Sequence, residues 1–370
     1  MNKNNGPGYR VLHAPIRALY QPALLTRGLR EHGVEVDLLY IDADKNPNYS
    51  SFTFEEPGQI ILQSDGLLNP AVMEYFLSAL DRYDIFHFHS GYTLFPWFYY
   101  GADLEILRKA GKKVFLSRWG CRDGRTPSDF DRDEGLCSGF CPMYGKSCTD
   151  EIIGKRLERE SEWANVIINH EPDFTGTNSS AVFLQGSIDI NFWRPGLRIP
   201  AEHALPAKKE GEVRVLHAVG GNNRGDVKGS AVIKGAMEDL AREGLRVDYR
   251  EVTGISFRDL RYHILQSDLV IDQLRYGSFG SFARESMALG VPVIGHVSGR
   301  QRIHYKNLPV VEATVNNAKD VIRGMLLSGT ERKRAGLLSR QYAEENFDYS
   351  KVTWKLAELY ERALSDQGRD

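Results

Sequence analysis

Residues 268–295 read DLVIDQLRYGSFGSFARESMALGVPVIG and predict one βαβ unit of a parallel sheet. The apolar run 269–272 predicts a buried strand, 282–289 has the spacing of a helix, and 292–296 predicts a second strand. Strand, helix and strand within about 30 residues are typical of such a unit. The glycine-containing loop before the helix leads into unpaired backbone amides and the positive end of the helix dipole, which favour an anion.

The same alternation continues on both sides of this unit and predicts an α/β protein with two doubly wound, Rossmann-like domains. In the first half we expect strands at 10–14, 34–41, 85–89, 113–117, 166–169 and 182–184, and helices at 19–32, 70–80 and 102–110. In the second half we expect strands at 214–218, 246–252, 269–272 and 292–296, and helices at 228–243, 257–266, 282–289, 317–327, 331–347 and 352–364. The segment 195–212 holds three prolines without apolar periodicity and indicates a linker.

A five-residue repeat opens each series. RVLHA occurs at residues 10–14 and again at 214–218. Two buried strands can share such residues through apolar preference alone. Because both copies begin an alternating series of strands and helices, the repeat also favours two domains of similar design.

Composition excludes several classes of function. The chain has 370 residues, with 47 Lys and Arg against 49 Asp and Glu, so its formal net charge is −2. Such a balance does not suit wholesale binding of nucleic acid or an anionic membrane. The first residues do not resemble a signal peptide, no run predicts a membrane-spanning helix, and we expect a cytoplasmic protein. The aromatic run YTLFPWFYY at 92–100 is expected to be buried.

Two stretches carry a resemblance to a known family. FARESMALGVPVIG (282–295) resembles the nucleotide-sugar signature of retaining GT-B glycosyltransferases, especially glycosyltransferase family 4. The resemblance implies that the helix glutamate, Glu285, binds the donor ribose. HAVGGNNRGDVKGS (217–230) is similar to the basic element of that family, which implies that Arg224 and Lys228 bind the donor diphosphate. Such positive groups would stabilise the charge of a leaving nucleoside diphosphate.

The resemblance also implies an arrangement of domains. A GT-B protein has two Rossmann-like domains that face a central cleft, and we assign 1–195 to the acceptor side and 196–345 to the nucleotide-sugar side. The remaining residues, 346–370, are expected to form a helix that packs back on the amino-terminal domain. The resemblance is weaker at 183–195 (FLQGSIDINFWRP) and in the first strand and helix.

The donor site departs from the family pattern in its details. The family often has a second glutamate eight positions before the first, where this chain has Gly277. We therefore expect backbone groups near the sugar and phosphates instead, since glycine permits close approach. The residues expected to bind the donor, besides Arg224, Lys228 and Glu285, are Gly220, Gly221, Asn222, Gly277, Ser278, Phe279, Gly280 and Ser281.

The acceptor side is expected at the ends of the amino-terminal strands. Arg17 stands where the family usually has a glycine pair, and Trp119 follows the strand after which many relatives have a histidine. With His89 and Arg122, these residues are the candidates for acceptor binding. His87 and His89 share one strand face, so they either orient an acceptor or form a buried hydrogen-bonded pair. His13 and His217, which end the repeated strands, are expected to be structural.

We therefore expect a retaining glycosyltransferase that moves a sugar from a UDP- or GDP-sugar to an unknown small-molecule or glycan acceptor. No metal and no further cofactor are expected. One alternative is a non-catalytic nucleotide-sugar or glycan binding protein. Another is a Rossmann-type dehydrogenase, which is disfavoured because GGNNRG at 220–225 has Asn222 where the dinucleotide fingerprint needs its second glycine.

Four cysteines leave a separate question open. Cys121, Cys137, Cys141 and Cys148 lie within one segment that we expect to be a long loop. Four thiolates can converge on zinc or an iron–sulfur cluster, but the spacing lacks a C-x2-C pair. A metal site, a disulfide and reduced thiols are all compatible with the sequence.

Overall fold

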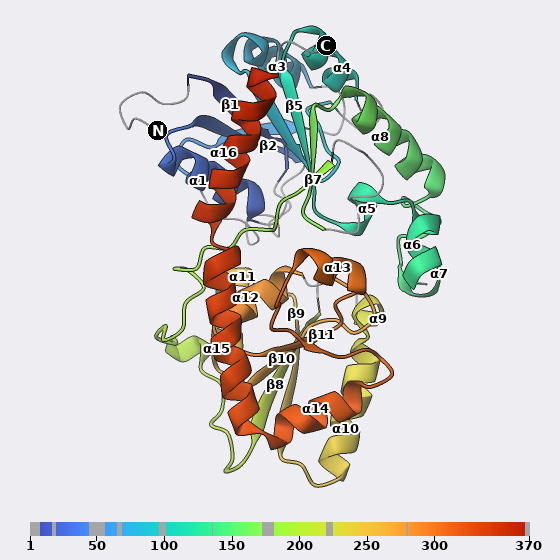
Figure 1. The fold of residues 1–370 in the computed structure, drawn as a ribbon, viewed down its shortest axis with the longest axis vertical. Helices are drawn as coiled ribbons and strands as arrows, with labels where there is room; N and C mark the ends of the chain where they lie inside the picture. Colours follow the sequence, from blue (N-terminus) through green and yellow to red (C-terminus); the bar gives the residue numbers. More distant parts are fainter. Residues whose placement is uncertain are drawn as a thin grey trace. The chain divides into compact units, whose positions relative to one another are not determined.

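The computed structural model of the chain describes residues 8–16, 20–43, 56–64, 69–95, 101–134, 136–171, 181–219, 225–278 and 280–366. It forms two compact units, which Figure 1 labels by their helices and strands. Unit 1 comprises Met1–Pro127, Ser147–Ser187 and Tyr349–Asp370, and unit 2 comprises Ser128–Lys146 and Ile188–Asp348. The functional division at residue 195 stays a prediction.

Unit 1 is built on a parallel sheet of seven strands in the described chain, ordered β3-β2-β1-β4-β5-β6-β7. The strands are β1 (Arg10–Ala14), β2 (Glu35–Ala43), β3 (Ile60–Ser64), β4 (Ile85–His89), β5 (Lys113–Arg118), β6 (Val166–Asn169) and β7 (Ala181–Phe183). The expected strands of this half match these bounds to within two residues, apart from β3, which the sequence pattern did not predict. β3 is short, lies at the sheet edge and leaves Ile61 exposed.

Helices cover both faces of this sheet. α3 (Pro70–Arg82) and α4 (Ala102–Lys109) pack on the face that buries Leu12, Phe86 and Leu116. The opposite face, which includes Val11, Ile85 and Phe115, packs against α1 (Gln21–Glu31) and α16 (Tyr349–Ser365). Alternation along each strand produces this division, because successive side chains point to opposite faces.

The last helix completes the core of unit 1. Figure 1 shows α16 beside α1, and the two helices are in direct contact. Gly28 permits this approach, because a Cβ at that position would overlap the side chain of Thr353. A face of the sheet formed early in the chain is therefore covered by residues from its end.

The cysteine-containing segment is largely helical, in contrast to the loop that we expected. It forms α5 (Cys121–Gly124), α6 (Pro127–Glu134) and α7 (Cys137–Phe140), and is followed by α8 (Asp150–Trp163). These first three helices are at most eight residues long, too short to show an apolar period. The carboxylate of Asp131 holds the start of α7 by accepting hydrogen bonds from the Cys137 and Ser138 N–H groups.

Unit 2 contains a five-stranded parallel sheet within the described residues, ordered β12-β11-β10-β8-β9. Its strands are β8 (Val213–Val219), β9 (Val247–Thr253), β10 (Leu269–Ile271), β11 (Val293–Gly295) and β12 (Val311–Glu312). Its helical segments, besides α6 and α7, are η3 (Ala201–His203), α9 (Gly225–Lys228), α10 (Ser230–Arg242), α11 (Phe257–Leu265), α12 (Ser281–Ala288), α13 (Gly299–His304), α14 (Ala318–Leu327) and α15 (Gly329–Asn346). The expected elements all recur, and η3, α9, α13 and the two-residue strand β12 are additional.

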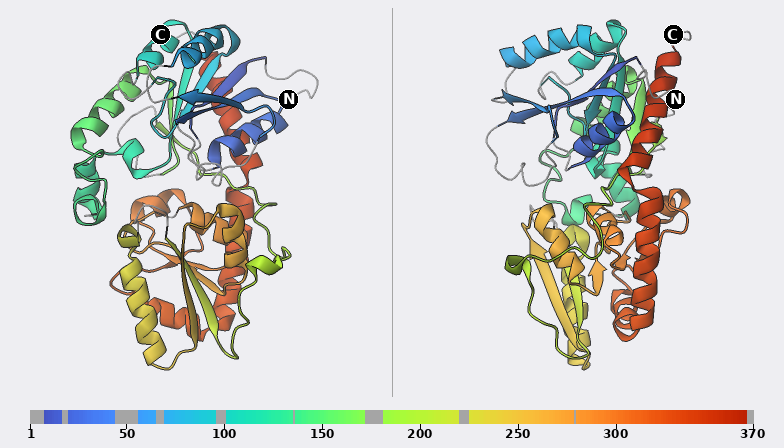
Figure 2. Two further views of the ribbon diagram at one scale, coloured as in Figure 1. Left: turned by 180° about the vertical axis from the view of Figure 1, so that it is seen from behind. Right: turned by 90° about the vertical axis from the view of Figure 1, so that its left-hand side faces the viewer.

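α10 and α14 pack together on one face of this sheet, over a core that includes Ile233, Ile271 and Ile322. α12 packs with α11 and α15, and α15 also contacts β11. The views of Figure 2 show helices on either side of the unit 2 strands. This is the doubly wound arrangement that the alternation of strands and helices predicted.

The repeated pentapeptide has equivalent contacts in the two units. The Arg10 N–H donates to Asp84 at 2.8 Å and the Arg214 N–H donates to Asp268 at 2.8 Å. Their guanidinium groups each bind an acid of the neighbouring strand, Glu35 in unit 1 and Asp248 in unit 2. The two copies are therefore structurally equivalent, beyond a shared preference for apolar residues.

Among the described residues, no helix is both long enough and apolar enough to cross a bilayer. The run 92–100 is described only as far as Phe95, and Leu94 and Phe95 are buried in the core of unit 1. Tyr92, in contrast to the expected burial, is 48% exposed, and residues 96–100 lie outside the described part of the chain.

Candidate functional site

Each sheet has one point where the strand order reverses. In unit 1 this point lies between β1 and β4, and in unit 2 it lies between β8 and β10. Ligands of open α/β sheets bind beyond the carboxyl ends of the strands at such a switch point. These two places are therefore the first candidates for a functional site.

In unit 2 the switch point holds a buried ion pair. Lys228 Nζ donates to Asp272 Oδ1 at 2.9 Å and to the Ala218 carbonyl at 3.0 Å. The side chain of Asp272 is 2% exposed and that of Lys228 is 16% exposed. Asp272 directly follows β10 and Ala218 lies near the end of β8, so the ammonium group bridges the two strands at their carboxyl ends.

Backbone geometry places Lys228 at this point. It ends α9, and Gly229 follows with φ +80°, a conformation that glycine adopts without strain. The Leu274 N–H donates to the Lys228 carbonyl at 2.9 Å, which ties the helix to the loop after β10. The Phe282 ring lies 5.4 Å from Nζ and adds a cation–π contact.

The glycine loop after β10 reaches the same carboxylate. The Gly280 N–H, at the N-cap of α12, lies 3.4 Å from Asp272 Oδ2. An ammonium group and a helix-end amide thus converge on one carboxylate, in the geometry of an anion site. In this structure the anion at that position is the Asp272 carboxylate of the protein itself.

The tip of the loop is closely packed. A Cβ at Gly277 would lie 2.8 Å from Ser298 Cβ, so only glycine fits there without movement. The Gly277 carbonyl accepts from the Ser298 N–H at 2.7 Å, and the Ser278 N–H donates to the Tyr276 carbonyl at 2.8 Å. The Ser278 amide, which we expected to face a ligand, is thus used within the loop.

The remaining donor-side residues are placed as follows. Glu285 lies on α12 and is 4% exposed, and Ser281 is the first residue of that helix. Gly220, Gly221, Asn222, Arg224 and Phe279 lie outside the described residues. Of the predicted donor residues, Lys228 and Gly280 both contact Asp272. Asp272 itself was not among the predicted site residues.

In unit 1 the switch point is filled by histidines. His13 on β1 and His87 on β4 face each other in register, and both are fully buried. The Tyr360 hydroxyl of α16 bonds both rings, at 2.9 Å to His13 Nε2 and 2.6 Å to His87 Nδ1. Ser117 bonds the other ring nitrogen of His87 at 2.7 Å and His170 Nε2 at 2.9 Å.

His89 and Trp119, two of the acceptor candidates, lie beside this network. Trp119 Nε1 donates to His89 Nδ1 at 3.3 Å, and the indole stacks on His170. His89 Nε2 is buried and has no hydrogen-bond partner within the described part of the chain. Arg17 lies outside the described residues, and Arg122 lies on α5.

Burial keeps these histidines neutral. It lowers the pKa of His13 to about 3. Burial, followed by neighbouring histidines, also holds the pKa values of His87 and His89 well below the usual value. The ring nitrogens of His13, His87 and His89 come within 4.8 Å of one another, a spacing open to a metal ion. Hydroxyl groups already bond both nitrogens of His13 and His87, so within the described chain the unpartnered ring nitrogen of this cluster is His89 Nε2.

His217, the second repeated histidine, is also buried. It bonds the Ile271 carbonyl at 2.8 Å and the Ser230 hydroxyl at 2.7 Å, and burial lowers its pKa. Thr26 bonds His13 in the same way as Ser230 bonds His217. Each of these hydroxyl residues follows its histidine by 13 positions. Both repeated histidines thus join the first strand of a unit to its first long helix.

None of the four cysteines, all of which are described, is in a disulfide. They also form no group at metal-ligand spacing within the described chain, where the histidine cluster is the one such group.

Comparison with known proteins gives matches in structure alone. No family model matches the chain, and no curated protein matches it in sequence. Sucrose-phosphate synthase from Thermosynechococcus elongatus superposes with a TM-score of 0.64 and 16% identity, over 96% of this chain and 99% of that one. This is the GT-B fold.

Two further GT-B neighbours were solved with ligands. The Anabaena protein HepE, in complex with UDP and glucose, has a TM-score of 0.62 and 12% identity over 95% of this chain and 99% of that one. The catalytic domain of starch synthase IV from Arabidopsis thaliana, bound to ADP and acarbose, has a TM-score of 0.61 and 12% identity over 96% of this chain and 99% of that one. At these identities the likeness establishes the fold.

Proposed function

We propose that the chain is a glycosyltransferase that moves a sugar from a nucleoside diphosphate sugar, a UDP- or GDP-sugar, to an acceptor hydroxyl with retention of configuration. The observation that carries the proposal is the convergence of Lys228 Nζ and the Gly280 amide at the switch point of unit 2. The ligands of two solved neighbours, UDP and glucose in HepE and ADP and acarbose in starch synthase IV, support it.

The lysine has the capacity for a phosphate ligand. An ammonium group has three donors, and in the described chain Lys228 uses two of them, for Asp272 and Ala218. We infer that the third donor binds a phosphate oxygen, and that Asp272 holds the ammonium in position for it. Arg224 is proposed to supply a second positive charge, and Glu285 to accept hydrogen bonds from the ribose hydroxyls.

In the proposed reaction, the oxygen of the acceptor hydroxyl bonds the anomeric carbon, and the hydroxyl proton passes to a phosphate oxygen of the leaving group. The bond between that carbon and the phosphate oxygen breaks, and the nucleoside diphosphate leaves with the electron pair. Positive groups already fixed at the phosphates stabilise the charge that develops on this leaving group. The acceptor is proposed to bind unit 1 near Arg17, His89, Trp119 and Arg122.

The test is incubation with UDP-, GDP- and ADP-sugars, with release of the nucleoside diphosphate followed by chromatography. We expect slow donor hydrolysis that Lys228→Met abolishes. Lys155→Met is the matched control, because that lysine forms an exposed pair with Glu151 on α8. Saturable binding without turnover would instead support a non-catalytic binding protein, and no binding of any donor would overturn the proposal.

A further inference from the structure

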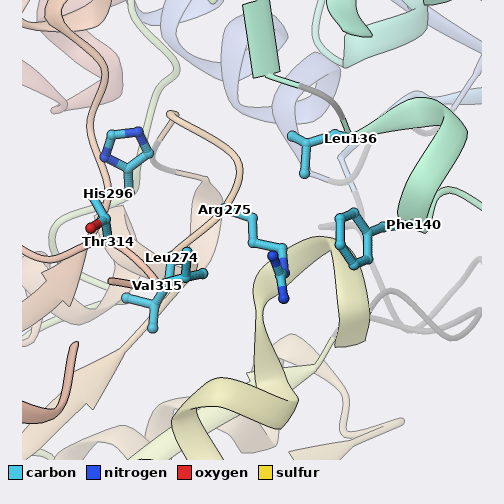
Figure 3. A pocket seen from close by; sticks show the side chains of 7 residues that line it. All are labelled: Leu136, Phe140, Leu274, Arg275, His296, Thr314 and Val315. Carbon is cyan, nitrogen blue, oxygen red and sulfur yellow. The ribbon is translucent and has the colours of Figure 1, made fainter. Parts of the chain in front are cut away.

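A pocket of about 200 Å³ lies at the carboxyl edge of the unit 2 sheet. It is lined by Leu136, Phe140, Leu274, Arg275, His296, Thr314 and Val315, shown in Figure 3. The last five follow β10, β11 and β12, and the first two belong to α7 and the residue before it. The volume is below the ~300–1,000 Å³ of drug-sized pockets and suits a single small ring.

The pocket adjoins the proposed diphosphate site. Leu274, in its wall, donates its N–H to the Lys228 carbonyl at 2.9 Å. A Cβ at Gly229 would lie 3.5 Å from Arg275 Cγ, so Arg275 packs beside the residue that follows Lys228. A sugar attached to a diphosphate at Lys228 would therefore lie close to this pocket.

Arg275 is a charged side chain without a counter-charge in the described part of the chain. Its guanidinium group lies over the Phe140 ring at 4.2 Å, and Figure 3 shows it between Leu274 and Phe140. Its Nε is buried and bonds no acceptor among the described residues. A buried donor without an acceptor is costly, and arginine stays protonated, so an anionic group of a ligand would satisfy it.

His296 provides a second polar group whose orientation is fixed. Its Nδ1 donates to Glu312 Oε1 at 2.7 Å, and Glu312 is also held by Arg302 and by the Val297 N–H. Burial opposes ionisation of Glu312, but these hydrogen bonds outweigh it and lower the pKa of the carboxyl group. An ionised carboxylate only accepts, so Nδ1 carries the proton of this hydrogen bond and Nε2 is the ring nitrogen left for a ligand.

That Nε2 points to the glycine loop. It would lie 3.3 Å from a Cβ at Gly277, the position that packing against Ser298 keeps without a side chain. The seven residues that line the pocket include two basic side chains, Arg275 and His296, and no acidic one. The pocket thus offers a positive fork at one wall and an oriented imidazole nitrogen at another.

We propose that this pocket receives the transferred sugar and selects a uronic acid, a sugar that carries a carboxylate. This inference rests on the function proposed above. Arg275 binds the carboxylate through its planar fork, and His296 Nε2 accepts a hydrogen bond from a ring hydroxyl. The fork of guanidinium donors matches the two oxygens of a carboxylate. His296 is oriented by Glu312, which acts as a positioning residue.

The experiment is calorimetric titration of the full chain with UDP, a UDP-hexose and the corresponding UDP-uronic acid, repeated with the GDP series. We expect the uronic acid to bind about 10–100-fold more tightly than the neutral hexose, as for a hydrogen bond to a charged group. Arg275→Met should remove this preference and leave UDP affinity unchanged. Arg275→Lys should retain part of it, because lysine keeps the charge without the fork.

A purely structural role for Arg275, as the partner of Phe140, predicts a different pattern. Arg275→Met would then lower the thermal midpoint and leave the preference between sugars as it was, as would Phe140→Leu. Equal affinity for hexose and uronic acid would overturn the inference, as would a preference that is unchanged in a folded Arg275→Met protein. UDP binding in the same experiment would still support the proposed function. Failure of every nucleotide to bind would overturn both.

Discussion

In unit 1 the strands at the switch point, β1 and β4, contribute three buried histidines, whereas in unit 2 the corresponding strands supply His217 and lead into Asp272. The equivalence is close, because His13 is in register with His87 and His217 with Ile271. One switch point is thus closed by neutral rings and hydroxyl groups, and the other holds a lysine beside a helix end. Similar strands can therefore support either a packed network of neutral rings or a buried pair of an ammonium group and a carboxylate.

The largest expected effect is that of acid on unit 1. A histidine whose pKa is lowered by burial makes its full contribution to stability at pH values above its pKa in the unfolded chain, about 6.5. This contribution is lost as pH falls towards its pKa in the folded protein, about 3 for His13. For His13 this loss is about 2 kcal/mol of unfolding free energy at pH 5 relative to neutral pH. Burial also lowers the pKa values of His87 and His89, so these two histidines destabilise the fold in the same direction as pH falls.

Hydrogen exchange of peptides at pH 7.5 and pH 5, corrected for intrinsic rates, measures this effect. We expect peptides from β1 and β4 to lose protection well before those from β8 and β10, where His217 is the corresponding buried histidine. Equal loss in both units would contradict the contrast between the two switch points.

The next effect concerns the ion pair of unit 2. Lys228→Met leaves Asp272 as a buried, uncompensated charge, and we expect a loss of about 3–5 kcal/mol in unfolding free energy. The double variant Lys228→Met/Asp272→Asn removes that charge and should recover most of the loss in a denaturant titration. If the double variant is no more stable than the single one, the pair is not the coupled unit described above.

The smallest effect is expected from substitution of the two hydroxyl residues that follow the repeated histidines. Ser230→Ala leaves a buried nitrogen of His217 without its 2.7 Å partner and should cost about 1–3 kcal/mol. Thr26→Val removes a longer contact, 3.3 Å to His13, and should cost less. Unfolding titrations of both variants check the order, and the reverse order would show that the two histidines are not equivalent.

Much of the fold follows from local pattern. The strands β1, β4 and β6 coincide with their predicted bounds, because short runs of apolar and β-branched residues mark buried strands. The edge strand β12 and the short helices α5 to α7 are too short to show a period, whereas the edge strand β3 (IILQS) carries an apolar run that the prediction missed. Periodicity thus identifies the buried elements and misses the marginal ones.

The site is less predictable because its contacts join distant residues. Tyr360 bonds His13 across 347 positions, a pairing that no local pattern contains. Asp272 could have been predicted from the sequence, because a carboxylate at the end of a buried strand needs a partner. Arg275 and His296 come together only through the loops after neighbouring strands, which sequence spacing alone does not reveal.

The central claim is that a nucleoside diphosphate binds at the switch point of unit 2. Calorimetric titration with UDP, GDP and the bare nucleosides tests it in the wild-type chain, in Arg224→Ala and in Lys228→Met/Asp272→Asn. We predict that a diphosphate binds the wild-type chain, that each variant weakens it by about 10–100-fold, and that any nucleoside affinity stays the same. Diphosphate affinity equal in all three proteins would contradict the claim.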